Sequence, residues 1–118
     1  MFSPDGGRLA LVMSIDGTTE ILTVKPNGRS LDRLTRNRVI DISPTWSPNG
    51  KRIAFVSDRA GSPQIYVMDR DGSDVRRLTF SGSYNTSPAW SPQGDWIAYE
   101  SRVGSQFDIW LIDPDGRE

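Results

Sequence analysis

Two Asp-x-Asp-Gly segments, at residues 69–72 and 113–116, are the strongest candidates for metal chemistry in this sequence. The same spacing opens a calcium-binding loop, in which alternate carboxylates supply oxygen ligands to the ion. That loop also needs a glutamate at its twelfth position, and neither segment provides one. Asp-Gly is in addition a strong hairpin-turn signal. We therefore interpret both segments as turns and predict neither a metal site nor a cofactor.

The side chains that most often carry out catalysis are scarce in this chain. It has no histidine and no cysteine, which removes the commonest general base and the best nucleophile. The Gly-x-Ser-x-Gly segment of serine hydrolases is also absent from the sequence. Lys25 and Lys51 are the only lysines, and both lie at predicted strand ends near turns. We predict that the chain is not an enzyme.

The charge balance points to no particular class of polyanionic partner. The chain carries 14 basic and 15 acidic residues, a net charge of −1 at pH 7. Nucleic-acid binding usually requires a basic excess or a basic stripe, so we expect no nucleic-acid partner. No apolar run approaches the roughly 20 residues that a membrane-spanning helix needs. We therefore expect no direct membrane insertion either.

An internal repeat sets the expected fold. Phe2, Trp46 and Trp90 each begin an aromatic-Ser-Pro-x-Gly segment, so the step between copies is 44 residues. The Leu-Thr pair at residues 34–35 recurs at 78–79 with the same step. Repeats of about 40–45 residues made of short strands are typical of propeller blades, each a four-stranded antiparallel sheet. The sequence predicts an all-β fold made of β-propeller blades.

Four strands are predicted in the central repeat, at residues 41–46, 52–57, 64–69 and 75–79. The two middle segments are apolar at consecutive positions rather than at alternate ones. That pattern is expected of a sheet covered on both faces, here by the neighbouring blades. No segment of the chain is predicted to be helical.

The phase of the repeat divides the chain into one complete blade and two incomplete ones. The first blade is expected at about residues 1–41, the second at about 42–85 and the third at about 86–118. Because a propeller closes with about four to eight blades, this partial propeller is expected to leave two apolar faces bare. The chain is therefore expected to be cut from a longer protein, or to pair with a second copy to complete a six-bladed ring.

Loops on a rigid scaffold are where binding residues usually lie, and two classes of loop share one rim of the expected blades. One class connects an outer strand to the next inner strand, and the other connects the second strand to the third. The polar and aromatic residues of these loops are our candidates for partner binding: Asp16, Arg38, Asp41, Asp58, Arg59, Tyr84, Asn85 and Arg102. Asp58 and Arg59 could instead pair with each other or cap turns.

The amino-acid sequence of the repeat resembles that of the propeller of the TolB family. The match covers the whole chain and is carried by Phe-Ser-Pro-Asp-Gly at residues 2–6, Ser-Asp-Arg-Ala-Gly-Ser-Pro-Gln-Ile-Tyr at 57–66 and Leu-Thr-Phe-Ser-Gly-Ser-Tyr-Asn at 78–85. The resemblance implies a six-bladed periplasmic propeller that binds the lipoprotein Pal through its loop rim and central channel. It also implies a role in the Tol-Pal system, which maintains the cell envelope, acts at division and is exploited for the import of colicins.

Two other functions remain open at this point. Related blades occur in prolyl oligopeptidases and tricorn-like proteases, where a propeller can gate a hydrolase that lies elsewhere in the chain. The chain could also be a structural repeat fragment that self-assembles.

Overall fold

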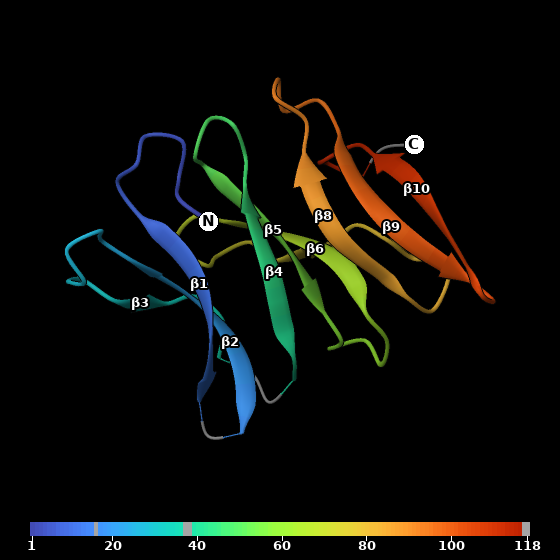
Figure 1. Ribbon diagram of the computed structural model, residues 1–118, viewed down its shortest axis with the longest axis horizontal. Helices are drawn as coiled ribbons and strands as arrows, with labels where there is room; N and C mark the ends of the chain where they lie inside the picture. The colour runs from blue at the N-terminus through green and yellow to red at the C-terminus, as the bar shows by residue number, and fades with distance from the viewer. Residues whose placement is uncertain (16, 37–38, 117–118) are drawn as a thin grey trace.

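The computed structural model describes residues 1–15, 17–36 and 39–116, and these contain only β-strands and connecting turns. The strands form three separate antiparallel sheets that lie side by side in chain order (Figure 1). Within the described residues we find no helix suited to crossing a membrane. The all-β class and the blade-like sheets predicted from the repeat are confirmed.

Each sheet is built from strands that follow one another in the chain. The first sheet contains β1 (Leu9–Ile15), β2 (Thr18–Val24) and β3 (Asp32–Arg33). The middle sheet contains β4 (Asp41–Trp46), β5 (Arg52–Ser57), β6 (Gln64–Asp69) and β7 (Arg76–Arg77). The third sheet contains β8 (Asn85–Trp90), β9 (Ile97–Val103) and β10 (Gln106–Ile112). We call the contact between the first and middle sheets the first junction, and that between the middle and third sheets the second junction.

The first three strands of the middle sheet have the predicted bounds, whereas the fourth is shorter than predicted. Only residues 76–77 of the predicted 75–79 form β7. The backbone of Asp74 has a φ of +54°, outside the strand region, which delays the start of the strand. At the other end the amide of Ile65 donates to the Thr79 hydroxyl at 2.9 Å. A side chain thus replaces the backbone acceptor that a longer strand would offer.

The predicted turns form as their residue types require. In the turn that joins β4 to β5, the Gly50 amide donates to the Ser47 carbonyl at 2.9 Å, and Gly50 has a φ of +71°. Gly72 also has a positive φ of +89°, and a Cβ there would lie 2.7 Å from the Leu34 carbonyl oxygen. Glycine at position 72 therefore allows the turn of the middle sheet to approach the first sheet closely.

The core lies at the two junctions, one on each face of the middle sheet. Buried side chains at the first junction are Ala10, Ile21, Trp46, Ile53, Phe55, Tyr66 and Met68. Those at the second junction are Ala54, Val56, Ile65, Val67, Leu78 and Ile97. The middle sheet is thus covered on both faces, as its apolar strands predict.

The last strand of the chain is much more exposed than its counterpart in the middle sheet. Ile65 of β6 is fully buried, whereas Ile109, one repeat later on β10, is 69% exposed. Phe107, Trp110 and Leu111 on the same strand are exposed as well. The third sheet therefore presents an uncovered apolar surface, as the incomplete repeat predicts.

Candidate partner-binding rim

Six of the eight candidate residues lie within the described part of the chain, whereas Asp16 and Arg38 lie outside it. Asp41 and Asn85 begin the inner strands β4 and β8, and Arg102 lies near the end of β9. Asp58, Arg59 and Tyr84 lie in the loops beside these strands. The strand register brings the starts of β4 and β8 to the same end of the sheets as the ends of β5 and β9, because Asp41 pairs with Ser57 and Asn85 pairs with Ser101. We call this end the candidate rim.

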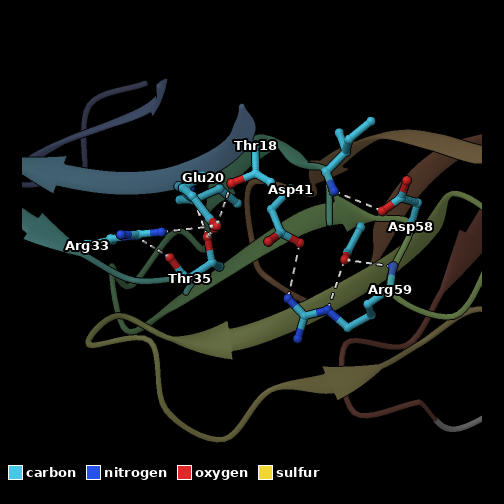
Figure 2. Close-up of polar contacts among 10 residues, drawn as sticks. Thr18, Glu20, Arg33, Thr35, Asp41, Asp58 and Arg59 are labelled. Atoms are coloured by element: carbon cyan, nitrogen blue, oxygen red, sulfur yellow. Dashed lines mark hydrogen bonds and ion pairs between the residues drawn. The ribbon is translucent and has the colours of Figure 1, made fainter. Parts of the chain in front are cut away.

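Arg59 is held in one orientation by a buried carboxylate. Its Nη2 lies 3.1 Å from Oδ1 of Asp41, which is fully buried, and its Nε donates to the Ser57 hydroxyl at 2.9 Å (Figure 2). The guanidinium carbon also lies 5.4 Å from the ring centroid of Phe55 and 5.0 Å from that of Tyr66. Stacking and pairing together make Arg59 a preorganised cation at the edge of the first junction.

Asp58 and Arg59 do not form a pair with each other. The Asp58 carboxylate accepts a hydrogen bond from the Ile40 amide at 2.9 Å, and the Asp58 amide donates to the Ile40 carbonyl at 3.2 Å (Figure 2). Asp58 thus joins the two loop classes at the candidate rim. Oδ2 of Asp41, by contrast, is buried without a hydrogen-bond partner.

Asn85 is buried at the second junction and holds neighbouring segments together. Its amide nitrogen donates to Oε1 of Gln64 at 2.8 Å and to the Ser81 carbonyl at 2.9 Å. Oε1 of Gln64 also accepts from the Thr79 hydroxyl at 2.6 Å. Asn85 is only 1% exposed, so its present contacts are internal ones.

Tyr84 and Arg102 form the exposed part of the candidate rim, together with an aromatic residue that the sequence reasoning missed. The Arg102 amide donates to the Tyr84 carbonyl at 2.9 Å, which joins the end of β9 to the loop before β8. The Phe107 ring stands edge-on to Tyr84 at 6.4 Å and lies 5.8 Å from the Arg102 guanidinium. Phe107 occupies the repeat position of Pro63, and this proline-to-aromatic change was the available signal.

A second polar cluster near the candidate rim was also missed. Glu20 is fully buried on β2, where its Oε2 accepts from the Thr35 hydroxyl and its Oε1 lies 3.3 Å from Nη2 of Arg33 (Figure 2). Thr18 donates to the same Oε1 at 3.4 Å. A signal was present, because Glu20 and Gln64 occupy the same repeat position in otherwise apolar strands.

The Asp-x-Asp-Gly segment at residues 69–72 is engaged in turn contacts. Oδ1 of Asp71 accepts from the Ser73 hydroxyl at 2.5 Å and from the Ser73 amide at 3.0 Å. These two hydrogen bonds hold the pKa of the Asp71 carboxyl below its usual range. In the part of the chain that the structure describes, no group of three acidic side chains is placed to hold a metal ion.

Comparison with known proteins supports one family. The TolB beta propeller domain family matches residues 1–118. Among curated proteins, the Tol-Pal system protein TolB of Anaeromyxobacter dehalogenans is 51% identical over 46 residues, which is 39% of this chain and 11% of that protein. The chain therefore spans only a small part of the curated relatives that it matches.

Solved structures give the same result. A putative TolB from Agrobacterium tumefaciens superposes with a TM-score of 0.90 at 30% identity, covering 99% of this chain and 45% of that one. TolB from Acinetobacter baumannii gives 0.86 at 38% identity, covering 97% and 29%. A puromycin hydrolase matches with a TM-score of 0.75 at 19% identity, covering 98% and 20%, and this likeness shows the fold alone. With the family match over its whole length, the chain belongs to the TolB β-propeller family.

Proposed function

We propose that this chain acts as a non-enzymatic, protein-binding part of a TolB-type propeller in the Tol-Pal system. By this proposal it works in the periplasm and contacts the lipoprotein Pal through the candidate rim. The support is the family membership together with the names of the relatives, which are Tol-Pal system proteins. A role in envelope integrity, division and colicin import follows from the same assignment.

The observation that carries the proposal is the exposed cluster of Tyr84, Arg102 and Phe107. Tyrosine and arginine are enriched among the residues that dominate the free energy of protein–protein binding. Tyr84 is 40% exposed and Phe107 is 54% exposed, although both rings are held by contacts with neighbours. Rigid aromatic anchors lose little conformational entropy on binding, which favours a recognition role.

Calorimetric titration of Pal into the purified chain tests this proposal. We expect Tyr84→Ala and Arg102→Ala each to weaken binding by roughly tenfold or more, the range of interface hot spots. Arg29→Ala is the matched control, because Arg29 lies in an exposed turn at the opposite end of the first sheet. Arg59 is less suitable for this test, since its removal leaves Asp41 buried without its cation.

Absence of Pal binding to the chain would contradict the proposal, and so would an equal loss in the Arg29→Ala control. Unchanged affinity in both rim variants would contradict the site while leaving family membership intact. Hydrolysis of peptide substrates by the purified chain would contradict its non-enzymatic character.

We also propose that the apolar surface of β10 is covered by the first sheet of a second copy, so that two chains complete a ring. The observation that favours this is continuity with an interface inside the chain, since the equivalent surface of β6 is covered by the next sheet. Light scattering over a concentration series should give a dimer. Ile109→Asp should yield a monomer, whereas Val75→Asp, a change at an exposed residue just before β7, should not. A wild-type monomer at every concentration would contradict this pairing.

A further inference from the structure

A cavity of about 670 Å³ opens at the first junction, at the end of the sheets opposite to the candidate rim. It lies between the end of the first sheet and the two turns of the middle sheet that follow β4 and β6. Its volume falls in the range of small-molecule sites. Its charged lining residues are Arg8, Asp32, Lys51, Asp69, Arg70 and Asp71.

The corresponding place at the second junction is bridged by an ion pair. Nη1 of Arg52 lies 3.0 Å from Oδ1 of Asp115, so the pair joins the middle and third sheets. The residues one repeat earlier are Arg8 and Asp71. Arg8 turns instead to its own sheet, where its Nη2 lies 3.0 Å from Oδ2 of Asp32. The first junction therefore lacks this bridge and leaves both Asp71 and the cavity accessible.

Two cations of the cavity lack acceptors. Over the described residues, no hydrogen bond or ion pair involves the side-chain nitrogens of Lys51 or Arg70. The Arg70 guanidinium lies 5.9 Å from the ring centroid of Trp46, and its charge contributes to the lowered pKa of Asp5. Both cations therefore retain donors for an anionic group.

The cavity also carries carboxylates in equal number. Three cations, Arg8, Lys51 and Arg70, face three aspartates that line the same space. Asp71 stays ionised through the neutral range, because hydrogen bonds from Ser73 lower its pKa. A dianion would gain from the cations but meet three carboxylates, whereas a ligand with one charge of each sign meets complementary groups.

We propose that this cavity binds a small zwitterion of the amino-acid or short-peptide class. Its carboxylate is received by Lys51 and Arg70, and its ammonium group by Asp71. The site is independent of the candidate rim, since the two lie at opposite ends of the sheets.

Titration calorimetry and amide chemical-shift mapping on the full chain test the proposal, with glycylglycine as the probe. We expect saturable binding that shifts the signals of residues 51 and 70–71. Lys51→Ala should weaken this binding by about tenfold, the effect of losing a charge-assisted hydrogen bond. Lys25→Ala is the matched control, because Lys25 is the other lysine of the chain and does not line the cavity.

Two further ligands at the same ionic strength separate the explanations. N-acetylglycinamide, which lacks both charges, should not bind, and inorganic phosphate should bind more weakly than glycylglycine. Tighter binding of phosphate would overturn the zwitterion in favour of a plain anion site. No saturable binding of glycylglycine, or equal loss in the two lysine variants, would overturn the site itself.

Discussion

The two junctions place polar side chains at the same repeat positions but satisfy them with different chemistry. At the first junction these positions hold two carboxylates, Glu20 and Asp41, whereas at the second they hold two amides, Gln64 and Asn85. All four side chains are buried. The amides bond directly to each other, with Nδ2 of Asn85 2.8 Å from Oε1 of Gln64.

Carboxylates cannot reproduce that bond, because an ionised carboxylate only accepts hydrogen bonds whereas an amide both donates and accepts. The first junction therefore brings in two arginines, Arg33 for Glu20 and Arg59 for Asp41. The repeat thus fixes where a buried polar group lies, and the charge of that group decides which kind of partner the fold must supply, an arginine for a carboxylate and a neutral hydrogen-bonding group for an amide.

The largest effect is expected from removing Arg59. Because Asp41 is fully buried, Arg59→Ala should lower the free energy of unfolding by about 3 kcal/mol, the cost of breaking a buried pair. The double variant Asp41→Asn, Arg59→Val copies the second junction, where Asn85 and Val103 hold these positions. Urea denaturation should show that the double variant recovers most of the loss. A double variant no more stable than Arg59→Ala would contradict the interchangeability of the two chemistries.

The reverse exchange, in which a carboxylate replaces a buried amide, can be made at Gln64. Gln64→Ala removes the acceptor of Thr79 and Asn85 and should lower the free energy of unfolding by about 2–3 kcal/mol. Gln64→Glu keeps that acceptor and loses the donations of the amide nitrogen to the Ser62 hydroxyl and the Gly82 carbonyl, so a smaller loss of about 1–2 kcal/mol is expected. Thermal and urea unfolding of both variants measure the difference. Equal losses would show that volume, and not hydrogen bonding, determines the role of Gln64.

A smaller difference is expected between the two threonines of the Leu-Thr repeat. The Thr35 hydroxyl donates to a carboxylate, whereas the Thr79 hydroxyl donates to an amide. Thr35→Val should therefore cost about 2 kcal/mol and Thr79→Val about 1 kcal/mol, because hydrogen bonds to charged groups are stronger. Chemical denaturation of the two nearly isosteric variants compares them directly. A larger loss of unfolding free energy in Thr79→Val than in Thr35→Val would contradict this comparison.

The smallest effect concerns pH and the first Ser-Pro turn. The Ser3 hydroxyl, the Gly7 amide and the Arg70 charge lower the pKa of Asp5 from its ordinary value of 3.8, whereas the equivalent turn has Asn49. The pKa of Asp5 is lower in the folded than in the unfolded state. Its contribution to the free energy of unfolding is therefore present above the unfolded-state pKa and is lost as pH falls through the folded-state pKa. Below about pH 4, the free energy of unfolding should therefore fall slightly less steeply with decreasing pH in Asp5→Asn than in the unsubstituted chain, as measured by urea denaturation at several pH values. An unchanged acid slope would contradict this role.

Much of the fold could be predicted because the signals for it are local. The bounds of the first three strands of the middle sheet follow from apolar runs between Pro and Gly turns. β7 was predicted too long, because the Thr79 side chain, and not its backbone, receives the Ile65 amide. The loops of the candidate rim could also be predicted, since alternate turns of an antiparallel sheet share one end.

The contacts within the candidate rim could not be predicted in the same way. Asp58 and Arg59 are neighbours in sequence, yet Arg59 bonds to Asp41, eighteen residues earlier. Phe107 pairs with Arg102 across β9 and β10, and both contact Tyr84, which lies just before β8 at the far edge of the same sheet. Such partners depend on sheet register and twist, which the residue types of one loop do not specify.

The amino-acid sequence by itself determined the repeat, the strand order, the turns and the membership of the TolB propeller family, because each depends on residues close together in the chain. The tertiary structure decided which polar groups are buried and which donors reach them. It also decided that Arg8 turns to Asp32, leaving a cavity where the next repeat forms an ion pair. These outcomes depend on the competition among several charged partners, which is resolved only when the sheets pack against one another.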